Sequence, residues 1–325
     1  MPTSLCDRIV VRWMKTFIRV AEIWLPNKEQ THLEFGASLH GSSPGFREAS
    51  AKVIFARGEG LPGEAWERGT PVIFSRLEGS QFRRKRRART AGLTGGVAIP
   101  VFGRESLHAV LVFLCGDDAK QAGAIEMWSA KAGAEELRLA DGYYGASGVA
   151  FAAASRQTGF RKGVGLPGTV WESGEPYFIE DLGRSARFLR AAAARPAGIN
   201  RGIGIPCAAP GGNQCVLTFL SSAATPIARR VEVWQPDAER ALLHRTCGYC
   251  ETFGLLPPTL GSVGIPAGKG AIGMAMKDGM PAISENAVGE LAAVGSPLAR
   301  TGIKSLAALP LLVEGRANFV VAWYF

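Results

Sequence analysis

Short apolar runs, separated by polar and glycine-rich segments, recur along the whole chain. The strongest stand at 109–114, 215–220 and 319–325, and each begins nine residues after the proline of an Ile-Pro or Leu-Pro pair. Short runs rich in β-branched and aromatic residues are typical of strands. In each third of the chain, the pattern predicts two strands, a helix, a turn, a short helix, a strand, a loop or helix, and two closing strands.

A glycine-rich turn occurs three times and divides the chain. The copies at 58–71, 163–176 and 268–281 read GEGLPGEAWERGTP, GVGLPGTVWESGEP and GKGAIGMAMKDGMP. Successive copies are 105 residues apart, and four glycines and the final proline occur in all three. A Glu-x-Trp triplet precedes each copy, at 22–24, 126–128 and 232–234. Repetition at a fixed step indicates three tandem units of about 100 residues each.

The second copy of the turn matches the Gly-x-Gly-x-x-Gly spacing of dinucleotide-binding loops. We expect a short helix to begin at Thr169 and to end at Gly174, which caps its C-terminus. A dinucleotide fold needs instead a long crossover helix that leads to a parallel strand. Because the predicted helix ends six residues after Gly168, the pattern argues against such an enzyme. The glycines are interpreted as a structural turn, with anion binding by the exposed amides of the turn as the alternative.

The order of motifs in the second unit resembles the GAF domain. The Glu-x-Trp triplet is followed by GVGLPGTVWESGEP, then by Phe188 with Arg190, and then by an Ile-Pro pair before an apolar strand. The resemblance is also close in the first unit. It is weaker in the third unit, whose turn lacks the Leu-Pro and Trp-Glu pairs.

The resemblance implies an α+β fold of three tandem domains, each with a central antiparallel sheet of about six strands flanked by short helices. The expected domains are 18–117, 122–222 and 228–325, and they follow an N-terminal helix at 1–17. The segments between the domains are short and consist largely of small or polar residues.

GAF domains are sensory modules, and the resemblance implies a pocket between one face of the sheet and the segments that cover it. In the second unit it assigns the ligand contacts to Phe178, Phe188, Arg190, Ile203 and Cys207. In the first unit it assigns them to Phe74, Phe82 and Arg84. The Arg190 guanidinium suits a carboxylate or phosphate, because it donates two parallel hydrogen bonds. Aromatic residues at such positions are more often part of a core, which is the alternative interpretation.

The sequence contains little catalytic chemistry. It has four histidines, and neither a Gly-x-Ser-x-Gly nucleophile elbow nor a His-Glu-x-x-His metal helix occurs. We therefore expect a non-catalytic sensor or adaptor that binds a small-molecule ligand, a protein partner or a second copy of itself. Because no effector pattern follows the third unit, signalling in trans is expected. The sequence names no cofactor.

A thiol-based redox or metal-binding protein is the principal alternative. His244, Cys247 and Cys250 stand in the segment HRTCGYC. Two thiols and an imidazole could contribute to a zinc or iron site, or the two cysteines could cycle as a redox pair. The competing interpretation is that these cysteines are small apolar residues of a strand and its turn. Six cysteines at irregular spacing fit a reducing compartment, and the cytoplasm is expected.

A basic run is the other strong signal. Six of the eight residues at 82–89 are cations, in a chain of net charge +9. An exposed helix face is the preferred interpretation. Anion or nucleic-acid binding through 83–89 is a weaker alternative, because Phe82 is the only aromatic residue at this run on which a base could stack. No apolar run approaches the roughly 18 residues of a membrane span, and none is expected.

Overall fold

The computed structural model of this chain describes residues 16–41, 44–104, 106–116, 121–295, 298 and 301–325. It has an α+β fold, and the strand pairings within its three sheets are antiparallel. The predicted α+β class with antiparallel sheets is therefore confirmed. The expected N-terminal helix at 1–17 lies outside the described residues, apart from its last two positions. None of the helices in the described part of the chain is long and apolar enough to cross a membrane.

The first sheet is built from residues 18 to 116. Its elements are β1 Ile18–Pro26, β2 His32–Leu39, α1 Pro44–Ser50, β3 Phe55–Ala56, α2 Gly60–Arg68, β4 Val72–Phe74, α3 Lys85–Thr90, β5 Leu93–Phe102 and β6 Leu107–Gly116. The strands lie in the order β3-β2-β1-β6-β5-β4. The first and last long strands are therefore neighbours at the centre of the sheet.

The second and third sheets follow in the chain. The second comprises β7 Ala122–Ala130, β8 Leu137–Gly145, α4 Gly148–Gln157, β9 Gly159–Phe160, α5 Gly165–Ser173, β10 Tyr177–Ile179, α6 Ala191–Ala194, β11 Arg201–Cys207, the 3₁₀ turn η1 Pro210–Gly212 and β12 Gln214–Ser221. The third comprises β13 Arg230–Pro236, β14 Leu242–Cys250, β15 Gly254–Leu255, β16 Ile265–Pro266, α7 Gly270–Asp278, β17 Ala282–Ser284, α8 Ala287–Glu290, η2 Ala292–Val294, β18 Leu306–Val313 and β19 Arg316–Tyr324.

The three sheets share a common strand order, in which β16 is the counterpart of β3 and β9, and β15 is an additional strand of the third sheet. The second runs β9-β8-β7-β12-β11-β10, and the third runs β15-β14-β13-β19-β18-β17, with β16 also paired to β14. The third unit differs before its glycine-rich turn. Where the first two units have α1 and α4, the segment between β14 and β16 holds the short strand β15 and no helix. Several apolar side chains of this segment are exposed: Phe253, Leu255, Leu260 and Val263.

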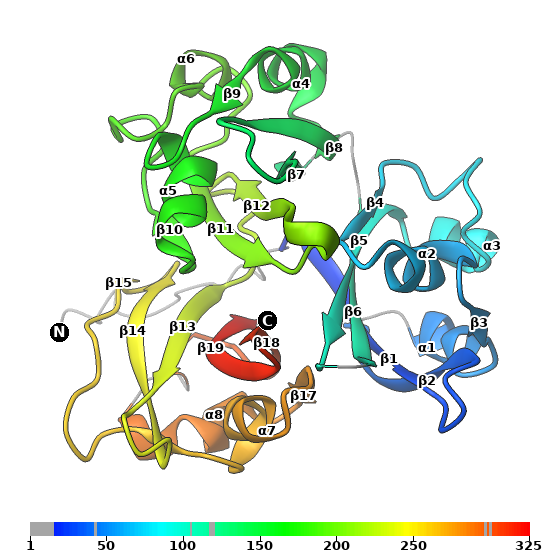
Figure 1. The fold of residues 1–325 in the computed structure, drawn as a ribbon, viewed down its shortest axis with the longest axis vertical. Helices are drawn as coiled ribbons and strands as arrows, with labels where there is room; N and C mark the ends of the chain where they lie inside the picture. The colour runs from blue at the N-terminus through cyan, green and yellow to red at the C-terminus, as the bar shows by residue number, and fades with distance from the viewer. Residues whose placement is uncertain (1–15, 42–43, 105, 117–120, 296–297, 299–300) are drawn as a thin grey trace, which may run out of the picture.

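The sheets pack against one another through their helix-free faces. Figure 1 shows the sheets around a common centre with the helices on the outside. At the centre, the rings of Phe113 on β6, Phe219 on β12 and Trp323 on β19 meet, with centroids 5.1 to 6.1 Å apart. Side chains of all three sheets form one buried core around these rings. Three further cores lie under the helices, one on each sheet. Strands buried on both faces are apolar at nearly every position, which explains the continuous apolar runs in the sequence.

Helix α5 begins earlier than the sequence predicts. It starts at Gly165 rather than Thr169 and ends at Ser173, and Gly174, whose φ of 69° is left-handed, caps it as predicted. Gly168 lies inside this helix, against the segment that follows β9. A Cβ atom there would stand 2.0 Å from a backbone carbonyl oxygen, and the corresponding distances in the other two turns are 2.2 and 2.3 Å. The third glycine of each turn is therefore required for close packing of the helix on the backbone.

Candidate functional site

A buried glutamate lies near the centre of each sheet. Glu22, Glu126 and Glu232 are fully buried. Each accepts a hydrogen bond from the indole N–H of the tryptophan two residues later, at 3.2, 3.3 and 3.2 Å. These tryptophans belong to the cores under the helices. The Glu-x-Trp triplet is thus a structural unit, in which the indole satisfies part of a buried carboxylate.

In the second unit, the cation that faces this glutamate is Arg190. Its Nη1 and Nη2 lie 2.5 and 2.8 Å from the two oxygens of Glu126, in a bidentate ion pair. The hydroxyl of Ser155, on α4, donates to the same carboxylate at 2.6 Å. Burial raises the pKa of Glu126, but the charge of Arg190 and these hydrogen bonds outweigh it and lower the pKa below its usual value. Four rings surround the guanidinium at 4.9 to 5.6 Å: Trp128, Phe151, Phe160 and Phe188.

The first unit repeats this arrangement with Arg84. Its Nη1 donates to Glu22 at 2.6 Å, and Ser50 on α1 donates to the same oxygen at 2.6 Å. Burial raises the pKa of Glu22, but the charge of Arg84 and the hydrogen bonds to the carboxylate lower it to about 2. The rings that surround the guanidinium, at 4.8 to 5.9 Å, are Trp24, Phe46, Phe55 and Phe82.

The third unit builds its ion pair from other positions. Arg230 on β13 and Arg245 on β14 donate to Glu232 at 2.5 and 2.8 Å. The hydroxyl of Tyr324 donates to the other oxygen of this carboxylate. Burial, followed by the negative charge of Glu232, raises the pKa of Tyr324 well above its usual value. Sequence reasoning missed the partners of Glu232. In the other units the arginine, Arg84 or Arg190, follows the glycine-rich turn, whereas Arg230 and Arg245 precede it.

These clusters occupy the space in which the resemblance places a ligand. The sequence predicts that Arg190 and Arg84 face the carboxylate or phosphate of a ligand, but each guanidinium holds a carboxylate of its own sheet. Phe188 and Phe82 are rings of the two cages. Phe74 belongs to the core under the helices of the first unit. A buried guanidinium is stable only beside an anion, and here the carboxylates of Glu22 and Glu126 are those anions.

The other predicted contacts lie on the opposite face of the second sheet. Ile203 is fully buried in the core that the three sheets share. Phe178 stacks on Tyr249 of the third unit, with ring centroids 5.2 Å apart. Cys207, at the end of β11, also packs against the shared core. Because side chains alternate between the faces of a strand, the predicted set is divided between two separate environments.

A hollow opens at one end of the shared core, where the three units meet. Its volume is about 250 Å³, and its walls come from β5, β11, β18 and β19. The prolines of the repeated Ile-Pro and Leu-Pro pairs line it: Pro100, Pro206 and Pro310. Their rings are apolar, and proline brings no backbone N–H donor to this space. Of the predicted ligand contacts, Cys207 lines this apolar hollow.

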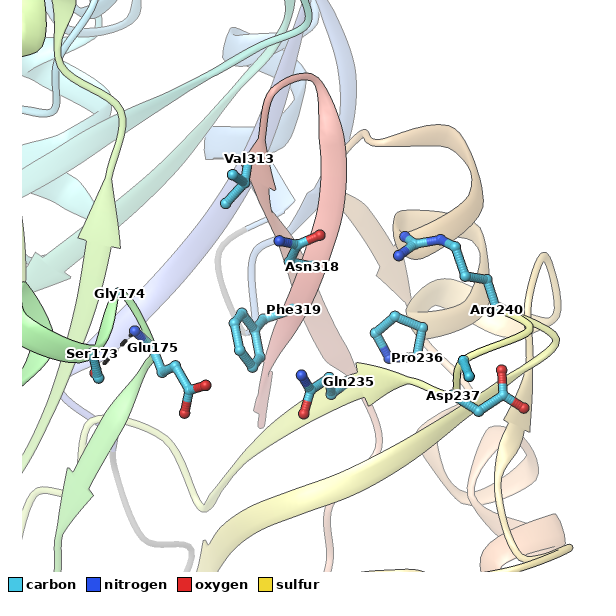
Figure 2. A pocket seen from close by; sticks show the side chains of 11 residues that line it. Ser173, Gly174, Glu175, Gln235, Pro236, Asp237, Arg240, Val313, Asn318 and Phe319 are labelled. Carbon is cyan, nitrogen blue, oxygen red and sulfur yellow. Dashed lines mark hydrogen bonds between the residues drawn. The ribbon is translucent and has the colours of Figure 1, made fainter.

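A larger and more polar hollow adjoins the apolar one (Figure 2). Its volume is about 560 Å³, and it lies between the turn after α5 and the strands β13 and β19. The two share three lining residues: Gly174, Val313 and Phe319. We call the two together the junction hollow. Sequence reasoning missed it, although the repeated proline pairs were a signal for it, because it exists only once the units have packed.

The geometry argues against a redox or metal site at His244, Cys247 and Cys250. The two cysteines lie three residues apart on β14, and therefore on opposite faces of the strand. Burial raises the pKa of Cys247 to about 11, which disfavours the reactive thiolate. Nδ1 of His244 lies 3.2 Å from the carbonyl oxygen of Val263. In the described ranges, no three His, Cys, Asp or Glu side chains are grouped so as to hold a metal ion.

The basic run is partly neutralised within the fold. Arg84 is buried in its ion pair, and Arg83 and Arg89 each pair with a glutamate, at 2.8 and 3.4 Å. Three further cations are exposed on α3: Lys85, Arg86 and Arg87. The run therefore forms an exposed helix face, as the preferred interpretation expects. Binding of an anion or a nucleic acid by this face stays a prediction.

A comparison with protein families identifies the first part of the chain. Residues 3–126 match the GAF domain family. The match covers the first sheet and extends into β7, which is less than half of the chain. This segment therefore carries a GAF domain. No curated protein matches the chain.

Solved structures similar to this chain match about a third of it. The GAF domain of an Acinetobacter phosphoenolpyruvate-protein phosphotransferase is 20% identical, over 31% of this chain and 56% of its own, with a TM-score of 0.24. Free methionine-R-sulfoxide reductase of Neisseria meningitidis, in complex with its substrate, is 14% identical, over 30% of this chain and 52% of its own, with a TM-score of 0.24. The NreA protein of Staphylococcus aureus, mutated in its nitrate binding site, is 17% identical, over 31% and 74%, with a TM-score of 0.25. The chain thus spans just over half the length of the first two.

Proposed function

We propose that this protein is a non-catalytic sensor or adaptor, in which three GAF-like units at 18–117, 122–222 and 228–325 are fused around one core. We propose further that it binds a small molecule in the junction hollow. The position of the open space in the structure supports this proposal. Ion pairs and aromatic rings occupy the interior under the helices, whereas residues of all three units line the hollow.

The composition of the junction hollow suits a small organic ligand. Ligand pockets are typically concave spaces of about 300–1,000 Å³, largely apolar, with a few polar groups that orient the ligand. The two parts of the hollow measure about 560 and 250 Å³. Prolines and Phe319 supply apolar walls, and polar side chains border the larger part. GAF domains commonly bind small ligands, which agrees with the match over residues 3–126.

A ligand in the junction hollow would act on the arrangement of the units. Because its contacts belong to all three units, it binds their assembled arrangement better than any loosened one, and binding shifts the population toward the assembled form. We propose that another molecule reads this change in trans, in the cytoplasm.

Mass spectrometry of freshly purified protein tests the proposal. A native mass that exceeds the denatured mass would reveal a bound species, and Ala208→Trp should abolish it, because Ala208 lines the apolar hollow and a tryptophan there fills it. Ala150→Trp, on the exposed face of α4, is the matched control and should retain the species. If Ala208→Trp still carried the bound species, binding in the hollow would be contradicted. If no preparation of the natural protein carried a bound species, a protein partner would be favoured instead.

A further inference from the structure

Polar side chains surround an aromatic ring in the larger part of the junction hollow. Figure 2 shows Glu175 and Gln235 on either side of Phe319, and Asn318 next to it along β19. Glu175 comes from the turn between α5 and β10, and Gln235 comes from β13. The second and third units thus contribute a carboxylate, two amides and a ring to one space.

The carboxylate of Glu175 is available to a ligand. Within the residues that the structure describes, it makes no hydrogen bond or ion pair. Its backbone is held in place, since its N–H donates to the hydroxyl of Ser173 at 3.1 Å. The other charged groups of this space are engaged. Asp237 accepts two backbone N–H groups of its own turn at 2.8 and 3.3 Å, and Arg240 donates to a backbone carbonyl of β19.

The charge of Glu175 acts on its surroundings. Burial first, and then the negative charges of Glu232 and Glu175, raise the pKa of the Cys247 thiol to about 11. A cation in the hollow would be attracted both by this carboxylate and by the face of the Phe319 ring. The amide oxygens of Gln235 and Asn318 are further acceptors for its N–H groups.

We propose that the ligand of the junction hollow is a small primary amine with an apolar tail, and that its ammonium group binds beside Glu175 and Phe319. This inference rests on the proposed function. The tail enters the adjoining apolar hollow, which shares the lining residues Gly174, Val313 and Phe319 with the polar one. A carboxylate or phosphate ligand is disfavoured here, because two acidic side chains, Glu175 and Asp237, border the polar hollow and would repel it. The one cation among its described lining residues, Arg240, already donates to a backbone carbonyl of β19.

Three probes with six carbon atoms each test the charge of the ligand. Hexylammonium, 1-hexanol and hexanoate are titrated against the full chain at pH 7, with ligand-observed NMR as the readout. Hexylammonium should bind about tenfold tighter than hexanol, and hexanoate should bind most weakly. Glu175→Gln should remove most of the preference for the cation and leave the affinity for hexanol unchanged. Glu180→Gln, another exposed glutamate of the second unit, is the control and should change neither.

The outcomes separate the two proposals. Equal affinities for hexanol and hexylammonium would overturn the amine assignment. So would a preference for hexylammonium that falls no further in Glu175→Gln than in Glu180→Gln. In both cases, the binding of hexanol would still support the hollow as a site. Binding of none of the three probes would likewise overturn the amine assignment. The proposed function fails independently, if a co-purified species survives in Ala208→Trp.

Discussion

The guanidinium of Arg190 lies against a carboxylate and among four aromatic rings, so its charge is neutralised within the fold. Without this cation, the fully buried Glu126 would be an unpaired charge. We expect Arg190→Met to lower the free energy of unfolding by about 3–5 kcal/mol at pH 7, as measured by urea denaturation. Arg184→Met is the control, because the Arg184 side chain is 92% exposed, and it should cost less than about 0.5 kcal/mol.

A double variant separates the lost charge from lost packing. In Glu126→Leu/Arg190→Met no buried charge remains, so much of the stability lost in Arg190→Met should return. If Arg190→Met were as stable as Arg184→Met, the ion pair would not exist in solution.

Glu22 makes stability depend on pH in the acid range. Its pKa is about 2 in the folded protein, against an ordinary 4.5, so on acidification the unfolded chain takes up a proton first. The stabilisation from Glu22 is therefore fully present above pH 4.5 and is lost as the pH falls toward 2, a difference of about 3 kcal/mol. Urea denaturation from pH 6 to pH 3 should show a steeper loss for the natural protein than for Glu22→Gln. Equal slopes would rule out a depressed pKa.

At the scale of elements, the order of strands and helices in the first two units could be predicted, because apolar runs and turn residues are local signals. The start of α5 could not. The letters GLPG are typical of a turn, and only contact with the segment after β9 shows that they form the first turn of the helix. The missing helix of the third unit was likewise not foreseen. Its segment between β14 and β16 is defined by pairing with β14, which a local pattern does not encode.

The candidate site could be predicted only in part, for a related reason. The sequence singled out Arg84 and Arg190 and one ring beside each, Phe82 and Phe188, but neither the other rings nor the carboxylates that pair with the arginines. Glu126 and Arg190 are 64 positions apart, and their contact depends on the closed fold of the unit. The junction hollow depends on a still higher level of structure, since its walls belong to three units.

Two glycines of the second turn allow a test of why the motif repeats. Gly168 has no room for a Cβ, because a backbone oxygen would lie 2.0 Å away, whereas Gly174 has open space around it and a left-handed φ. Gly168→Ala should therefore cost about 3 kcal/mol of unfolding free energy, and Gly174→Ala about 1 kcal/mol, from backbone strain alone. Thermal and urea unfolding of both variants check this order. The reverse order would mean that the motif is kept for its cap rather than for packing.

At the scale of the whole molecule, the three units are joined by more than short linkers. Each sheet turns its helix-free face toward the other two, and the shared core contains side chains from all of them. The pair Arg201 and Glu251, 2.9 Å apart, adds a contact between the second and third units. A sheet taken alone would expose this apolar face to water, at a cost proportional to its area. Folding of one unit is therefore expected to depend on the other two.

Phe219 provides the sharpest test of this dependence, because its ring touches Phe113 of the first unit and Trp323 of the third. Phe219→Ala should lower the free energy of unfolding by about 3–5 kcal/mol. Hydrogen exchange should then accelerate in β6 and β19 as well as in β12, since the cavity lies between the sheets. Phe160→Ala is the matched control. That ring is equally buried but belongs to the second unit's own core, so exchange should rise first within the second sheet. If Phe219→Ala also affected only the second sheet, the three units would be stable independently, and a ligand in the junction hollow could not act on all of them together.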